Sequence, residues 1–212
     1  DGEDLEADCA VCCAGRVPAT GRLGLRKLGV QSSPVDGGVL VDAGLETACA
    51  GVFAAGGVLE GGAAAGTARA QGITAAERIA GVREPGRGAS STTAAAITTM
   101  ALAAWVGLGE EDARASGVEI SVGVAPLEEN TAAILRNDTD GFVKVVADRA
   151  TGEILGVHFA GAGATEAVAT AALAMRQELT VDDLADQAAP MPSLAKALEV
   201  AARAAGTRRR RT

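Results

Sequence analysis

A short apolar stretch that runs into two glycines constrains this chain more than any other feature. Residues 51–58 read Gly-Val-Phe-Ala-Ala-Gly-Gly-Val, and an alanine-rich stretch of helical character follows. The pattern predicts a buried strand over 51–58 and a helix over 64–80 that ends at Gly81. Glycine lets the backbone approach a ligand, and a helix start offers free N–H groups. Such a unit is therefore typical of a cofactor edge, although paired glycines also mark ordinary turns.

Few large side chains are available to build a core. Of the 212 residues, 48% are hydrophobic, yet only 2% are aromatic. Such a core buries little area per residue, so we expect the fold to be helped by a partner surface.

The net charge of −8 argues against a nucleic-acid binder. The chain has no uncharged run of 18 apolar residues and no signal-peptide pattern at its acidic start, so we expect neither a membrane span nor secretion.

Three of the four cysteines lie close together, at Cys9, Cys12 and Cys13, and the fourth is Cys49. The Cys9 to Cys12 spacing suits a metal or redox motif, but residues 7–14 read as a buried strand, in which positions three apart face opposite ways. No second Cys or His cluster completes a zinc site. We therefore predict no metal site and interpret the cysteines as core residues, which suits a reducing compartment.

The second half of the chain has clearer periods and follows a linker rich in Arg, Pro, Gly and Ser, placed at 86–94. Alternation and turn residues predict three strands, over 118–124, 141–148 and 153–161. Helical spacing predicts four helices, over 110–114, 165–178, from Thr180 onward with a near capping box, and 193–205 with Ser193 as N-cap. This half is predicted to be an antiparallel sheet with helices on one side, an α+β fold.

Three other features favour a structural interpretation. His158, the only histidine, lies mid-strand, where a hydrogen-bonded sheet residue is more common than a catalytic one. Glu128 and Glu129 are adjacent, so their side chains diverge, and we expect both to be solvated. The run 208–211 is all arginine and could contact an acidic partner or RNA, but in an acidic chain we interpret it as a solvated tail.

Seven short motifs occur in an order that is similar to the C-terminal half of one family. They are Asp8-Cys9 with Gly15-Arg16-Val17-Pro18, residues 38–42 followed by Thr47, residues 52–56, 141–144, 154–158 and 180–184, and Pro190-x-Pro192-Ser193-Leu194-x-x-Ala197-Leu198. The chain resembles the flavoprotein (pyridine nucleotide–disulfide) oxidoreductases, which include dihydrolipoamide dehydrogenase, glutathione reductase and mercuric reductase. Residues 126–135 and 170–176 look most like the mercuric reductase branch.

The resemblance implies a layout and a cofactor. Residues 1–85 would be an α/β remnant of the NAD(P)- and FAD-binding domains, and 95–212 would be the interface domain through which such enzymes form homodimers. Gly56, Gly57 and Val58 would lie at the FAD. Residues 38–42 would be a further short strand of the remnant.

The chain departs from the family pattern at the chemical positions. Neither dinucleotide fingerprint nor the redox-active Cys-x4-Cys occurs in it. Gly57 stands where the family has an aspartate that binds the ribityl chain of FAD. Met191 and Lys196 stand where a His and a Glu form the family's acid–base pair, and Ala189 replaces a second histidine. Methionine cannot take up a thiol proton, so we predict no catalytic residue. Because the aspartate and the dinucleotide-binding unit are missing, we also predict that this chain alone does not retain FAD.

Three interpretations follow. The chain is a truncated, diverged relative that is inactive alone and acts through its dimerisation domain, as a homodimer or with a related flavoprotein subunit. Alternatively, it is the C-terminal part of an active flavin-dependent NAD(P)H oxidoreductase that another chain completes. A decayed gene product without a selectable function is the third.

Overall fold

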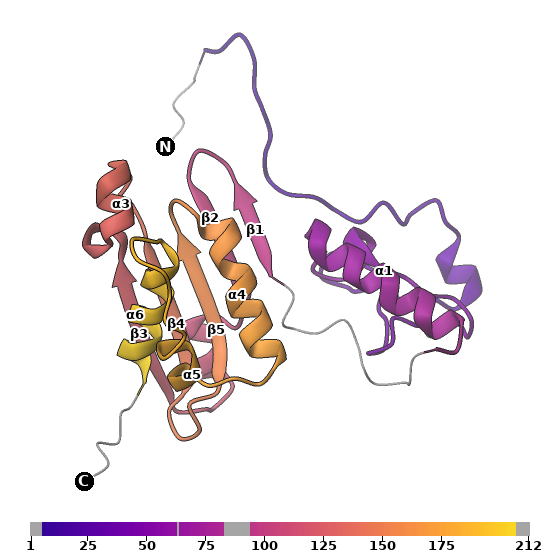
Figure 1. The fold of residues 1–212 in the computed structure, drawn as a ribbon. Helices are drawn as coiled ribbons and strands as arrows, with labels where there is room; N and C mark the ends of the chain where they lie inside the picture. The colour runs from indigo at the N-terminus through magenta and orange to yellow at the C-terminus, as the bar shows by residue number, and fades with distance from the viewer. Residues whose placement is uncertain (1–5, 63, 83–93, 207–212) are drawn as a thin grey trace.

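The computed structural model of the protein describes residues 6–62, 64–82 and 94–206. Their buried apolar side chains gather in an N-terminal cluster, from 30–75, and in clusters of the C-terminal part, from 104–205. Figure 1 shows the two parts, with helix α1 (Ala65–Ile79) in the first and a helix-covered sheet in the second. None of the described helices is long and apolar enough to cross a membrane.

The C-terminal part is built on one antiparallel sheet of five strands in the order β1-β2-β5-β4-β3. Their bounds are Ala95–Thr98 (β1), Leu102–Gly107 (β2), Ile120–Pro126 (β3), Phe142–Asp148 (β4) and Ile154–Ala160 (β5). Trp105, His158, Lys144 and Val124 lie opposite one another across β2, β5, β4 and β3. Side chains alternate between faces, so this row lies on the face away from the main core.

Three helices cover one face of the sheet, as Figure 1 shows: α4 (Ala164–Arg176), α5 (Val181–Ala185) and α6 (Ala195–Ala205). The core between them and the sheet is made of Ala, Val and Leu with one isoleucine, Ile154, and a single aromatic, Phe159. Small side chains let the layers approach closely. A Cβ at Gly123 of β3 would overlap the carbonyl of Ala201 in α6. The predicted α+β layer is thus confirmed, and the short helix α2 (Glu110–Ala115) packs through Ala113 against Val146 on the other face.

Most predicted elements of this half are confirmed, and the structure adds others. The strands β3, β4 and β5 and the helices α2, α4, α5 and α6 fall where the periods placed them. Sequence analysis missed β1 and β2, because their alanines hide the alternation. It also missed η3 (Leu127–Glu129) and α3 (Thr131–Arg136), which are too short to show a helical period.

The two predicted helix starts differ in outcome. Thr180 and Asp183 form a complete capping box at the start of α5. The Ser193 prediction is wrong: Leu194 is the N-cap of α6 and makes no side-chain cap, while the buried Ser193 hydroxyl has no hydrogen-bond partner.

The N-terminal part confirms the helix and contradicts the strands. Helix α1 spans Ala65–Ile79, and two short 3-10 turns, η1 (Leu25–Leu28) and η2 (Gly56–Val58), accompany it. Residues 7–14 form no strand and are exposed. Residues 38–42 make only single bridges, at Val39, and residues 51–58 make one, between Phe53 and Glu46, before η2. A strand needs a hydrogen-bonded neighbour along its length. Among the described residues, 7–14 have no such neighbour, and 38–42 and 51–58 have only isolated bridges.

The predictions for individual residues have mixed outcomes. Cys9, Cys12 and Cys13 are exposed, so the prediction of core cysteines is wrong for these three, whereas Cys49 is half-buried and packs against the N-terminal apolar cluster. His158 is held in the sheet with its Nε2 2.9 Å from the Leu108 carbonyl oxygen, as expected of a hydrogen-bonded sheet residue. Glu128 and Glu129 are exposed, also as expected. The linker, except its last residue, and the arginine run at 208–211 lie outside the described residues.

Candidate functional site

The predicted flavin edge is a turn rather than the end of a buried strand. Residues 45–54 fold back on themselves, since Thr47 N–H donates to the Val52 carbonyl at 2.8 Å and Ala54 N–H to that of Leu45 at 3.0 Å. Gly56 follows with φ 83° and is buried. The positive φ favours glycine, and a Cβ there would lie 3.2 Å from the Cβ of Ala68 in α1, so a larger residue would also require Ala68 to shift.

Gly57 and Val58, which follow Gly56, differ in their exposure. Gly57 is exposed, and a Cβ added to it would meet no atom within 4 Å. Val58 is half-buried, and its carbonyl accepts from the Val39 N–H at 2.9 Å. The nearby start of α1 has Ala64 as N-cap, with no side-chain cap and no acidic residue in the first turn. The edge therefore has space and free helix N–H groups but no carboxylate, which fits only part of a flavin site.

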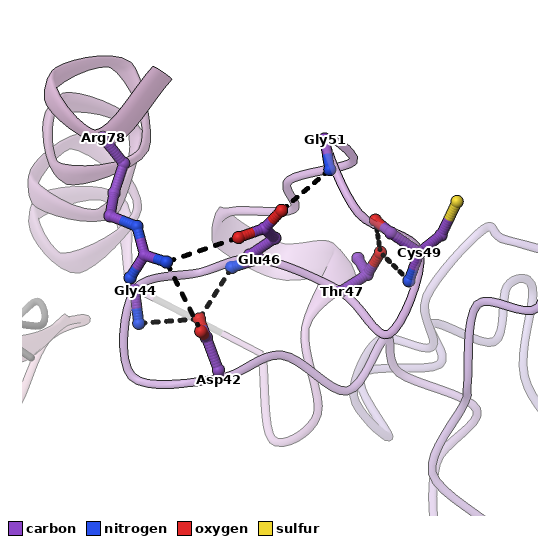
Figure 2. A network of polar contacts seen from close by, with 7 residues as sticks. All are labelled: Asp42, Gly44, Glu46, Thr47, Cys49, Gly51 and Arg78. Atoms are coloured by element: carbon purple, nitrogen blue, oxygen red, sulfur yellow. Dashed lines mark hydrogen bonds and ion pairs between the residues drawn. The ribbon is translucent and has the colours of Figure 1, made fainter. Parts of the chain in front are cut away.

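A polar network fixes this turn to the far end of α1 (Figure 2). Arg78, in the last turn of α1, lies 3.3 Å from a Glu46 oxygen and 3.7 Å from an Asp42 oxygen. Glu46 in turn accepts from the Gly51 N–H at 2.7 Å. A Cβ at Gly44 would overlap the Arg78 guanidinium, so a larger residue there would move the arginine side chain. The N–H groups of Glu46 and Gly44 and the charge of Arg78 keep the pKa of Asp42 below its ordinary value.

Met191 and Lys196, which stand at the family's acid–base positions, have different surroundings. Met191 is 68% exposed. Lys196 Nζ lies 2.5 Å from an oxygen of Glu199, which is 4% exposed and also accepts from Arg203 at 3.1 Å and from the Ala189 N–H at 3.3 Å. The hydrogen bond from Lys196 is the main cause of a lowered pKa of Glu199. Lys196 thus partners a buried carboxylate and is not held toward residue 191.

A pocket of about 210 Å³ opens beside these residues. The end of β3 and the start of α3 form one wall, and the Met191–Ser193 segment and the first turns of α6 form the other. Asn130 joins the walls: its side chain caps α3 and donates to the Ser193 carbonyl at 3.1 Å. Sequence analysis did not find this pocket, because its two walls are about 60 residues apart in the chain. The lining residues are Ala125, Pro126, Glu129, Asn130, Thr131, Met191, Pro192, Ser193, Lys196, Ala197 and Val200.

Over the part of the chain that the structure describes, no three His, Cys, Asp or Glu side chains gather as metal ligands do. The flavin edge, 56–58, and the pocket at 191–200 belong to different apolar clusters and share no lining residue. The two sets of candidate residues therefore form two sites rather than one.

Comparison with known families identifies the family of this chain. Residues 93–202 match the pyridine nucleotide-disulphide oxidoreductase dimerisation domain, and residues 1–72 match the pyridine nucleotide-disulphide oxidoreductase domain. The chain belongs to the pyridine nucleotide-disulphide oxidoreductase family. The resemblance inferred from the seven motifs is thereby confirmed.

Individual members of the family give the extent of the match. The chain is 34% identical to mitochondrial dihydrolipoyl dehydrogenase of Canis lupus familiaris, over 94% of this chain and 38% of that protein. It is 34% identical to dihydrolipoyl dehydrogenase 3 of Pseudomonas aeruginosa, over 94% and 42%. Its fold matches the crystal structure of LpdA from Mycobacterium tuberculosis with a TM-score of 0.76 and 31% identity, over 88% and 40% of the two chains. The chain thus spans about two fifths of the relatives that it matches.

Proposed function

We propose that this chain is an association module of the pyridine nucleotide-disulphide oxidoreductase family, inactive alone, that forms a homodimer or binds a related flavoprotein subunit through residues 95–212. The supporting observation is the exposure of large apolar side chains on α3, on α6 and on the segment before α6, which are elements that also form the walls of the pocket. We name four of these side chains the α3–α6 patch: Ile134, Leu135, Met191 and Val200, with 55%, 71%, 68% and 41% exposure. Met191 and Val200 also line the 210 Å³ pocket, and such hollowed apolar surfaces are typical of interfaces.

The chemistry of the patch supports association rather than catalysis. Methionine at position 191 cannot exchange a proton, and Lys196 is engaged with the buried Glu199. All four cysteines are free, which supports our proposal of a reducing compartment.

Sedimentation velocity of the chain at micromolar concentration tests the proposal. We expect a dimer, and we expect Leu135→Asp or Met191→Asp to shift it to monomer, because a charge in the interface is costly to bury. Val35→Asp is the control, since Val35 is 85% exposed and lies in the N-terminal part. A wild-type monomer, or a dimer that neither variant in the patch weakens, would contradict the proposal.

A second candidate is the C-terminal part of a flavin-dependent NAD(P)H oxidoreductase that another chain completes. The open space at Gly57, where an added Cβ meets no atom within 4 Å, and the uncapped start of α1 favour it. We expect Gly57→Asp to tighten FAD binding, followed by quenching of flavin fluorescence, if this edge still holds the cofactor. Ala50→Asp adds the same charge to an exposed loop position and is the control. Equal affinities for all three proteins would exclude this candidate.

A further inference from the structure

Three thiols lie on a segment that no strand or helix holds. Cys9, Cys12 and Cys13 are exposed and free, and residues 6–14 are exposed throughout. The backbone of residues 6–14 makes no hydrogen bond to any other described residue. Changing the conformation of this segment therefore breaks no hydrogen bond and uncovers no apolar core.

The spacing of the thiols permits a disulfide between Cys9 and Cys12 and disfavours one between Cys12 and Cys13. A β-turn over four residues brings its end Cα atoms within about 7 Å. The disulfide range is about 4.4–6.8 Å, so a turn over Cys9-Ala10-Val11-Cys12 lets the two sulfurs meet. Cys12 and Cys13 are adjacent, and their Cα atoms, about 3.8 Å apart across a trans peptide, are too close for an unstrained disulfide.

We propose that Cys9 and Cys12 form a reversible intrachain disulfide when the chain meets a low-molecular-weight disulfide. One cysteine thiolate attacks a sulfur of the small disulfide, which forms a mixed disulfide and releases one small thiol. The other cysteine then attacks the protein-bound sulfur of the mixed disulfide and releases the second small thiol. Two protein thiols are oxidised, one small disulfide is reduced to two thiols, and the protons of the two cysteines end on these thiols.

Ring closure favours the intrachain disulfide over a stable adduct. Only two residues separate the partners, so the loop-closure cost is small and the second thiol acts at high effective concentration. This dithiol differs from the family's Cys-x4-Cys, which does not occur in the chain. Cys49, half-buried in the turn next to Thr47, belongs to a different part of the fold and remains reduced.

The test treats the full chain with oxidised glutathione, quenches it with acid and alkylates the remaining thiols. Trypsin releases residues 1–16 as one peptide with Cys9, Cys12 and Cys13, because Arg16 is its first basic residue. We expect this peptide to lose two hydrogens and to keep one alkylated cysteine. Cys13→Ser should still close the disulfide, whereas Cys12→Ser should accumulate glutathione adducts at Cys9.

Three results would overturn the proposal: glutathione adducts without a cross-link in the wild type, a disulfide that needs Cys13, or three thiols that stay reduced while Cys49 reacts. Reduced glutathione added afterwards should restore the three thiols, which distinguishes reversible exchange from further oxidation.

Discussion

Glu199 is a buried carboxylate with three donors, and removing Lys196 tests what holds it. Lys196→Met removes the donor at 2.5 Å and leaves Glu199, 4% exposed, with the half-exposed Arg203 and the Ala189 N–H. A hydrogen bond to a charged group contributes about 1.5–3 kcal/mol. Because two donors remain, we expect a loss of about 2 kcal/mol in the free energy of unfolding, toward the lower end of that range.

The double variant Lys196→Met/Glu199→Leu shows how much of the loss in stability depends on the buried carboxylate of Glu199. Glu199→Leu removes the carboxylate, and the cations it leaves, 30% and 46% exposed, can reach water. Once the carboxylate is gone, Lys196→Met should cost little, so we expect a coupling of about 2 kcal/mol between the two changes, close to the whole effect of the single variant. Urea unfolding at pH 7 and one fixed protein concentration measures it. The control pair is Glu119 with Arg149, which is well exposed and should show no coupling.

The same pair has a predictable pH dependence. The folded pKa of Glu199 lies below its ordinary value of 4.5, so its contribution to stability is complete above about pH 4.5 and falls as the pH drops through the folded pKa. The difference between wild type and Lys196→Met should therefore shrink in acid. Additive single effects at pH 7, or a difference that grows in acid, would refute the buried-carboxylate argument.

Two glycines should respond in opposite directions to alanine, measured by the same urea unfolding. Gly123→Ala should destabilise the C-terminal part by about 2 kcal/mol or more, because the new methyl overlaps the backbone of α6. Gly72→Ala should stabilise α1 by about 1 kcal/mol, since Gly72 is an exposed helix-interior residue with no atom near its missing Cβ. A neutral Gly123→Ala would mean that β3 and α6 are not in close contact.

The sequence alone determined the elements that depend on local periods, and the order of motifs that identified the family. Strands β3 to β5, helices α1, α4 and α5 and the capping box at Thr180 depend on residues close in the chain. Gly57, Met191 and Lys196 could also be recognised as departures, because a missing carboxylate or imidazole is visible in the letters themselves.

Tertiary structure decided what depends on distant partners. Residues 7–14 have a strand-like sequence but pair with no strand among the described residues, so Cys9, Cys12 and Cys13 are exposed. Lys196 and Glu199 are neighbours on α6, but Glu199 accepts from the Ala189 N–H only where α6 packs against the 186–192 segment. The pocket forms where the start of α3 meets Ser193 through Asn130. Burial and pairing are properties of two surfaces, and a single segment specifies only one of them.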